Sequence, residues 1–112
     1  MKENDASLIY EKHKKEIDND DPEEYGLPFG YEADDMVKTF VILNDNHLRY
    51  DEILNYLEEN GEMVSGLSIS GLTYDPETES HVNGRVVYFT EEYTKEQLSE
   101  LFGGVLIDSK IC

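Results

Sequence analysis

The sequence predicts an α+β protein in which strands and helices follow one another in the order β-α-β-β-α-β from residue 36 onward. Three observations predict this class. A short apolar run at 36–43 has the pattern of a buried strand, residues 50–60 and 94–102 carry apolar side chains at helical spacing, and the segments between and after them alternate as strands do.

The central strand is predicted at 36–43, the most apolar continuous segment of the chain (MVKTFVIL). Polar residues bound it on both sides, so the run is too short for a helix. Because side chains alternate along a strand, Phe40 and Ile42 would lie on one face and Val41 and Leu43 on the other. A strand that is apolar on both faces is expected in the middle of a sheet.

The first helix of this unit is predicted from about Tyr50 to Asn60. Acidic residues occupy its first turn, where the helix dipole favours anions, and Gly61 stands at the expected end. The residues at helical spacing that would form its apolar stripe are Ile53, Leu54, Tyr56 and Leu57.

A twisted hairpin is expected next. Residues 63–74 alternate as a strand, and Gly71 shifts the phase of the alternation, which indicates a bulge or bend. Residues 75–78 are typical of a turn, and Asn83-Gly84 is a second turn signal just before the apolar strand at 85–90.

The second helix begins at a capping box, Thr94-Lys95-Glu96-Gln97, with Tyr93 and Leu98 placed as a hydrophobic staple. Gly103-Gly104 ends it, and 105–107 is a final strand. This order predicts the ferredoxin-like arrangement, with two helices on one face of a four-stranded antiparallel sheet. Many unrelated functions share that fold, so the fold alone predicts none.

Residues 1–35 form an acidic N-terminal arm, distinct from the single α+β domain at 36–112. Asp5 or Ser7 would cap a short helix that runs to about Ile17, and the proline and like charges of 18–24 would end it.

The segment 25–31 (YGLPFGY) has no periodicity and is predicted to be a loop. Leu27 and Phe29 would cover an open face of the sheet. The alternative is a docking segment, in which Tyr25, Phe29 and Tyr31 anchor a partner that the flanking carboxylates attract.

The strongest functional observation is the charge. The chain has 26 acidic and 9 basic residues, a net charge of -17, and the excess is shared between residues 1–35 (-8) and 36–112 (-9). A polyanion repels nucleic acid and anionic membranes, so direct binding to either is not expected. Basic proteins are the expected partners.

No pattern of catalytic, metal-binding or cofactor-binding residues is present in the sequence. His13, His47 and His81 lack the spacing of metal ligands, and 18–24 lacks the glycine of a calcium loop. We therefore expect no enzyme activity, no metal and no cofactor. Cys112, the single cysteine, would be a free thiol on a frayed end, which fits a reducing cytoplasm, and we expect a cytoplasmic protein.

The outer faces of the two helices are expected to form one acidic plate. In the second helix, Glu92, Glu96 and Glu100 recur every four residues, which would place one carboxylate about every 6 Å. The first helix would contribute Asp51, Glu52, Glu58 and Glu59.

These observations predict a non-enzymatic inhibitor that imitates nucleic acid and occupies the basic cleft of a DNA- or RNA-binding protein. In composition the chain resembles anti-CRISPR and anti-restriction proteins of phages and mobile elements, which are small and acidic and act on bacterial defence nucleases. The alternative is a small regulatory or assembly module, such as a homodimer, whose acidity serves only solubility.

Overall fold

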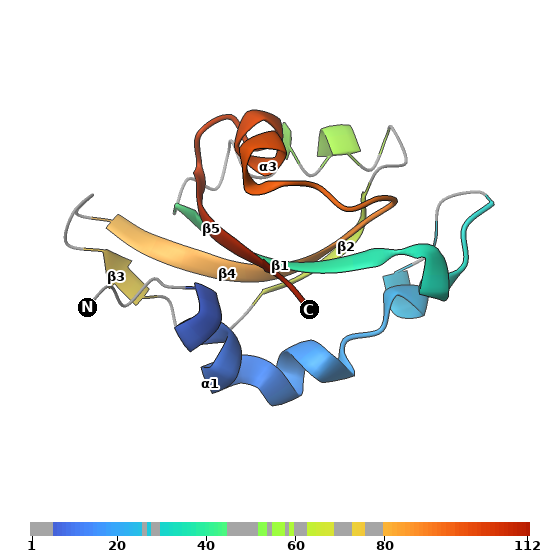
Figure 1. Ribbon diagram of the computed structural model, residues 1–112, viewed down its shortest axis with the longest axis horizontal. Helices are drawn as coiled ribbons and strands as arrows, with labels where there is room; N and C mark the ends of the chain where they lie inside the picture. Colours follow the sequence, from blue (N-terminus) through green and yellow to red (C-terminus); the bar gives the residue numbers. More distant parts are fainter. Residues whose placement is uncertain are drawn as a thin grey trace.

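The computed structural model is an α+β protein built on one antiparallel sheet with helices on both of its faces (Figure 1), which confirms the predicted class. The structure describes residues 6–25, 27, 30–44, 52–53, 55–57, 59, 63–68, 73–75 and 80–112. None of the described helices is both long enough and apolar enough to cross a membrane.

The sheet contains β1 (Val37–Asn44), β2 (Met63–Ser68), β3 (Thr73–Asp75), β4 (Ser80–Phe89) and β5 (Leu106–Ile111). Neighbouring strands follow the order β2-β4-β1-β5, and β3 also pairs with β4. Every one of these pairings is antiparallel. Strand β1 therefore lies inside the sheet between β4 and β5, as its apolar sequence predicts.

Two apolar layers lie on opposite faces of β1, which confirms the predicted alternation. Phe40 and Ile42 belong to one buried cluster, and Val41 and Leu43 belong to the other. All four side chains are buried because helices cover both faces of the strand.

Helix α1 (Ala6–Asn19) covers the first of these faces, which we call the α1 face (Figure 1). Its Ile17 is fully buried in the cluster with Phe40, and Leu27 packs against the same cluster. Leu27 thus covers the sheet, as one of the two interpretations of 25–31 expects. Two short 3-10 turns, η1 (Pro22–Tyr25) and η2 (Ala33–Asp35), lie between α1 and β1.

Helix α3 (Lys95–Leu101) covers the opposite face, which we call the α3 face. The described residues of 52–59 are helical and lie on the same side, because Leu57 shares a buried cluster with Leu98 and Phe102 of the α3 segment. The two predicted helices thus cover one face together.

Local signals place both ends of α3 as predicted. The Thr94 hydroxyl accepts a hydrogen bond from Gln97 N–H at 3.1 Å, and Gln97 Oε1 accepts one from Thr94 N–H at 2.8 Å, which completes the capping box. At the other end Gly103 and Gly104 have φ of 63° and 87°, values that favour glycine.

Some local predictions are wrong. Asn83-Gly84 is not a turn, because both residues pair with β1 inside β4, opposite Leu43 and Ile42. Pairing with a buried central strand outweighs the local turn preference of this dipeptide. Ser7 does not cap α1, since the helix already begins at Ala6.

The C-terminal strand is longer than predicted and its end is not frayed. Strand β5 continues to Ile111, and Cys112 N–H donates a hydrogen bond to the Lys38 carbonyl at 2.9 Å. The Cys112 thiol is free and exposed. The predicted bend at Gly71 lies outside the described residues.

Candidate acidic interface on the α3 face

Glutamates line the outer surface of the α3 face. The sequence predicts an acidic plate on this face, and every described side chain of that plate is exposed: Glu52, Glu59, Glu92, Glu96 and Glu100. Glu91, which the sequence prediction did not include, is exposed as well. Asp51 and Glu58 lie outside the described residues.

Helix α3 directs two of these carboxylates to solvent. Leu98 and Phe102 are buried against the sheet, so Glu96 and Glu100 lie on the opposite side of the helix. The predicted helical row of three is wrong, however. Because Thr94 caps α3 and the helix begins at Lys95, Glu92 precedes the helix and its position is not set by helical spacing.

Tyr56 was predicted to point inward, and this is wrong. Ile53 and Leu57 pack against the buried cluster, but Tyr56 is 58% exposed. Residues 53 and 57 are one turn apart and face the cluster, and position 56 lies at the border of this stripe; Leu54 lies outside the described residues. Tyr56 follows Glu52 by four residues and precedes Glu59 by three, so an exposed aromatic ring lies among carboxylates.

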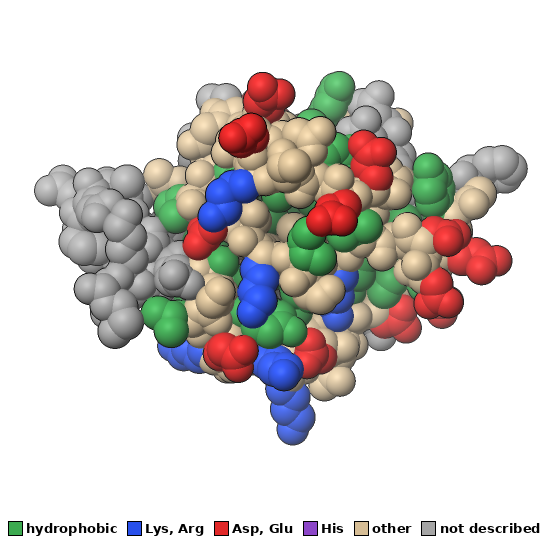
Figure 2. Space-filling view, in the orientation of Figure 1, with side chains coloured by type: hydrophobic (Ala, Val, Ile, Leu, Met, Phe, Trp, Pro, Cys, Tyr) green, Lys and Arg blue, Asp and Glu red, His purple; other side chains and the backbone are tan. Residues whose placement is uncertain are grey.

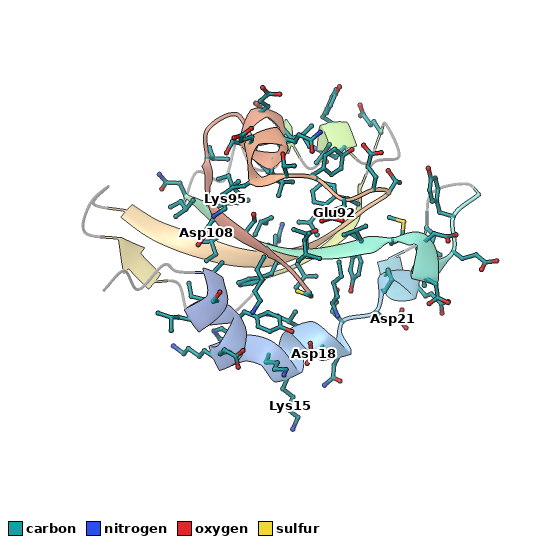
Figure 3. All side chains as sticks on the ribbon, viewed as in Figure 1. Lys15, Asp18, Asp21, Glu92, Lys95 and Asp108 are labelled. Atoms are coloured by element: carbon teal, nitrogen blue, oxygen red, sulfur yellow. The ribbon has the colours of Figure 1, made fainter. Side chains whose placement is uncertain are left out.

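Few cations oppose this negative charge. Between residues 51 and 109 the only lysine or arginine residues of the sequence are Arg85 and Lys95. Arg85 is half-buried in β4, opposite Val41. Lys95 forms an ion pair with Asp108 of β5 (Figure 3), so its charge is directed to the edge of the sheet. Among the charged side chains seen in the upper half of Figure 2, over α3, most are acidic.

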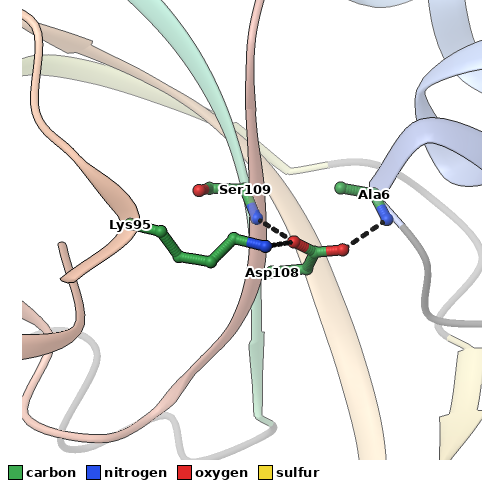
Figure 4. Close-up of polar contacts among 4 residues, drawn as sticks. All are labelled: Ala6, Lys95, Asp108 and Ser109. Atoms are coloured by element: carbon green, nitrogen blue, oxygen red, sulfur yellow. Dashed lines mark hydrogen bonds and ion pairs between the residues drawn. The ribbon is translucent and has the colours of Figure 1, made fainter.

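Asp108 joins three elements at this edge (Figure 4). Its carboxylate accepts hydrogen bonds from Ala6 N–H at 3.0 Å, from Ser109 N–H at 2.9 Å and from Lys95 Nζ. Burial alone would raise the pKa of this carboxyl group, but the three donors outweigh burial and hold the pKa of Asp108 below its ordinary value. The ionised carboxylate thereby fixes the start of α1 to β5.

The α1 face differs in that it carries both signs of charge. Lys12, Lys14 and Lys15 are exposed on α1, and Figure 2 shows Lys and Arg side chains gathered in its lower half, over this helix. Lys38 Nζ donates to the Asp20 carbonyl at 3.1 Å, and Lys110 Nζ lies 4.1 Å from the centre of the Tyr10 ring.

Tyr10 and His13 are engaged within the same helix. The Tyr10 hydroxyl donates to Asp18 Oδ1 at 3.1 Å, and desolvation together with this hydrogen bond raises the pKa of Tyr10. His13 Nδ1 lies 3.7 Å from Glu16 Oε2. No cluster of three or more metal-ligating side chains occurs among the described residues.

The three predicted aromatic anchors are not brought to the α3 carboxylates by any described contact. Tyr31 is 41% exposed and lines a shallow hollow of about 330 Å³ with Leu27 and Glu32, next to the start of β1. The backbone of Tyr25 ends η1, and Phe29 lies outside the described residues. Of the aromatic side chains described, Tyr56 is the one exposed beside Glu52 and Glu59.

Comparison with known proteins does not place the chain in a family. No family model matches the sequence, and neither a curated protein nor a solved structure is significantly similar to it.

Proposed function

We propose that this chain is a non-enzymatic inhibitor that imitates nucleic acid and binds the basic cleft of a DNA- or RNA-binding protein, such as a bacterial defence nuclease. The observation that carries the proposal is the small number of cations among the exposed glutamates of the α3 face. Among the described residues, Arg85 and Lys95 are the cations that accompany the exposed glutamates of α3 and 52–59, and Asp108 engages Lys95.

The magnitude of the charge is appropriate for such an imitation. The molecule is 43 Å long, and duplex DNA carries about 25 negative charges over that length. The net charge of -17 is of the same order. In this proposal the carboxylates accelerate encounter with a basic cleft, and Tyr56 supplies a rigid aromatic group that loses little entropy when it is buried.

We propose that the architecture is the four-stranded ferredoxin-like one, in which β2 and β3 are two parts of one strand that pair with successive parts of β4. Three features support it: the strand order β2-β4-β1-β5, the antiparallel pairing of each described neighbour, and the helical residues between β1 and β2. In this arrangement α1 is an addition that covers the face which the two other helices leave open. We also propose a cytoplasmic location, where a nucleic-acid-binding target would be found.

The test compares two variants that each remove three negative charges. The first neutralises Glu92, Glu96 and Glu100 to glutamine. The control neutralises Glu11, Glu23 and Asp34, which are exposed outside the α3 face. Immobilised wild-type protein is used to isolate a target from bacterial lysate, and the affinity of each variant for the purified target is then measured at 0.15 M salt with and without competing duplex DNA.

The expected result is a loss of affinity on the order of tenfold for the α3 variant and a much smaller loss for the control, because rim charges act over about one Debye length of 8 Å. DNA should displace the wild-type protein from its target. Equal losses in both variants, or a complex that DNA does not displace, would contradict the proposal.

A further inference from the structure

We infer that the edge strand β5 pairs with β5 of a second copy of this chain, and that Asp108 of each copy then lies opposite Lys110 of the other. The product is a two-fold symmetric dimer with one continuous antiparallel sheet. This inference concerns the edge of the sheet and does not depend on the proposed function.

The outer edge of β5 is open in the described structure. In the strand order β2-β4-β1-β5, β5 pairs with β1 on one side and with no described strand on the other. Cys112 N–H donates to the Lys38 carbonyl, so the N–H groups of residues 112, 110 and 108 point toward β1. Those of Ser109 and Ile111 therefore point away from the sheet, where a further strand would bind, whereas the register of β5 with β1 shifts at Ile107.

The sequence of this edge is complementary to itself. Residues 107–111 read Ile-Asp-Ser-Lys-Ile, with an acid and a base placed symmetrically about Ser109 and an isoleucine at each end. When two copies pair antiparallel with Ser109 opposite Ser109, each Asp108 faces Lys110 of the other copy. No other register centred on one residue of 107–111 pairs both charges with their opposites.

Backbone geometry permits this register. The polar groups of residues 109 and 111 point outward, and Ser109 of the two copies would form the central hydrogen-bonded pair. Asp108 and Lys110 would then form the non-hydrogen-bonded pairs, in which side chains approach most closely.

The two charged side chains also lie on the same side of the sheet. Asp108 bonds Ala6 N–H of α1, and Lys110 lies over the Tyr10 ring of α1. Both are thus on the α1 face, so across a two-fold axis they would meet rather than lie on opposite faces.

In the isolated chain, Asp108 competes with this pairing. Its Oδ1 accepts the Ser109 N–H at 2.9 Å and also binds Lys95. That N–H lies at the centre of the predicted interface. Dimerisation therefore exchanges the bond from Ser109 N–H to Asp108 for one to the Ser109 carbonyl of the other copy, and it exchanges Lys95 for Lys110 of the other copy. This exchange makes the dimer weak and reversible.

Salt should strengthen the dimer. Each copy carries a net charge of -17, so long-range repulsion opposes association. Screening at 0.5 M salt shortens the range of that repulsion, whereas backbone hydrogen bonds across the interface do not depend on salt. A complex between the acidic α3 face and a basic protein would respond in the opposite direction, so the two associations are distinguishable.

The first experiment is sedimentation equilibrium of the wild-type chain and of Ser109→Pro, over a wide range of protein concentrations at 0.05 M and 0.5 M salt. Proline removes the outward N–H of Ser109 and leaves the hydrogen bonds between β5 and β1 intact. We expect a wild-type dimer that forms at least tenfold more tightly at high salt, and a variant that remains monomeric. A wild type that is monomeric up to millimolar concentration, or a variant that dimerises equally, would overturn the inference.

The second experiment tests the register with two charge-reversed variants, Asp108→Lys and Lys110→Asp. Each variant alone places like charges opposite one another and should not dimerise. A mixture of the two should form a heterodimer, because each Lys then faces an Asp. Homodimers of either variant, or no heterodimer between variants whose circular dichroism is native, would exclude this register.

Discussion

The two faces of the sheet are alike in their packing and unlike in their charge. On each face a buried apolar cluster lies against β1, and helices cover that cluster. On the α1 face the exposed lysines of α1 lie among acids, whereas on the α3 face the exposed glutamates have few cations near them. The two faces therefore differ in the share of cations among their exposed charges, and packing does not require this difference.

The largest effects on stability should come from substitutions in the two buried clusters. These substitutions test whether both faces of the sheet belong to one cooperative folding unit. Phe102→Ala on the α3 face should lower the free energy of unfolding by about 3–5 kcal/mol, and Ile17→Ala on the α1 face by about 2–4 kcal/mol, because both side chains are fully buried. Denaturant unfolding followed by circular dichroism measures both. If α1 were only an appendage of the sheet, Ile17→Ala would leave the midpoint of the main transition unchanged.

Sequence reasoning succeeds where the determinant is local. Alternation along 36–43 assigns Phe40 and Val41 to opposite faces, and the capping box fixes the start of α3, since both patterns involve residues close in the chain. It fails where a distant contact decides. Asn83-Gly84 has the local preference of a turn, yet pairing with β1 keeps it in a strand.

The candidate sites follow the same rule. The exposed glutamates could be predicted, because a helix with a buried stripe must present its charged residues to solvent. The anchoring of α1 by Asp108 could not, since Ala6 and Asp108 are 102 positions apart and neither residue belongs to a motif. Tyr56 was missed because an aromatic residue at helical spacing is ordinarily assigned to the core.

A smaller effect concerns Asp108, the residue that joins the two faces. Asp108→Asn should lower the free energy of unfolding at pH 7 by about 1–2 kcal/mol, because it weakens charged hydrogen bonds to Ala6, Ser109 and Lys95. The folded-state pKa lies below the unfolded value of about 3.9, so this stabilisation is complete above that value and is lost as the pH falls through the folded-state pKa.

Thermal unfolding of wild type and Asp108→Asn between pH 3 and pH 7 measures the difference in stability between the two proteins. This difference should become smaller as the pH falls. Asp34→Asn is the matched control, because Asp34 is an exposed carboxylate in the η2 turn, away from Asp108 in the sequence. If wild type and Asp108→Asn differ in unfolding temperature by as much at pH 3 as at pH 7, the charge of Asp108 is not what stabilises the fold.

The smallest effect tests the charge of the two faces directly. Glu96 and Glu100 are like charges four residues apart on α3, and Glu100 also lies at the unfavourable end of the helix dipole. Glu100→Gln should therefore raise the free energy of unfolding by about 0.2–0.5 kcal/mol at low salt. Glu11 is exposed and lies close in sequence to the exposed lysines Lys12 and Lys14, so Glu11→Gln should lower the free energy of unfolding by a similar amount. Both differences should disappear at 1 M salt, where the Debye length is about 3 Å. If the two Glu→Gln substitutions change the free energy of unfolding in opposite directions, negative charge destabilises the fold on the α3 face and is not there to stabilise it. Changes in the same direction would mean that the two faces do not differ electrostatically.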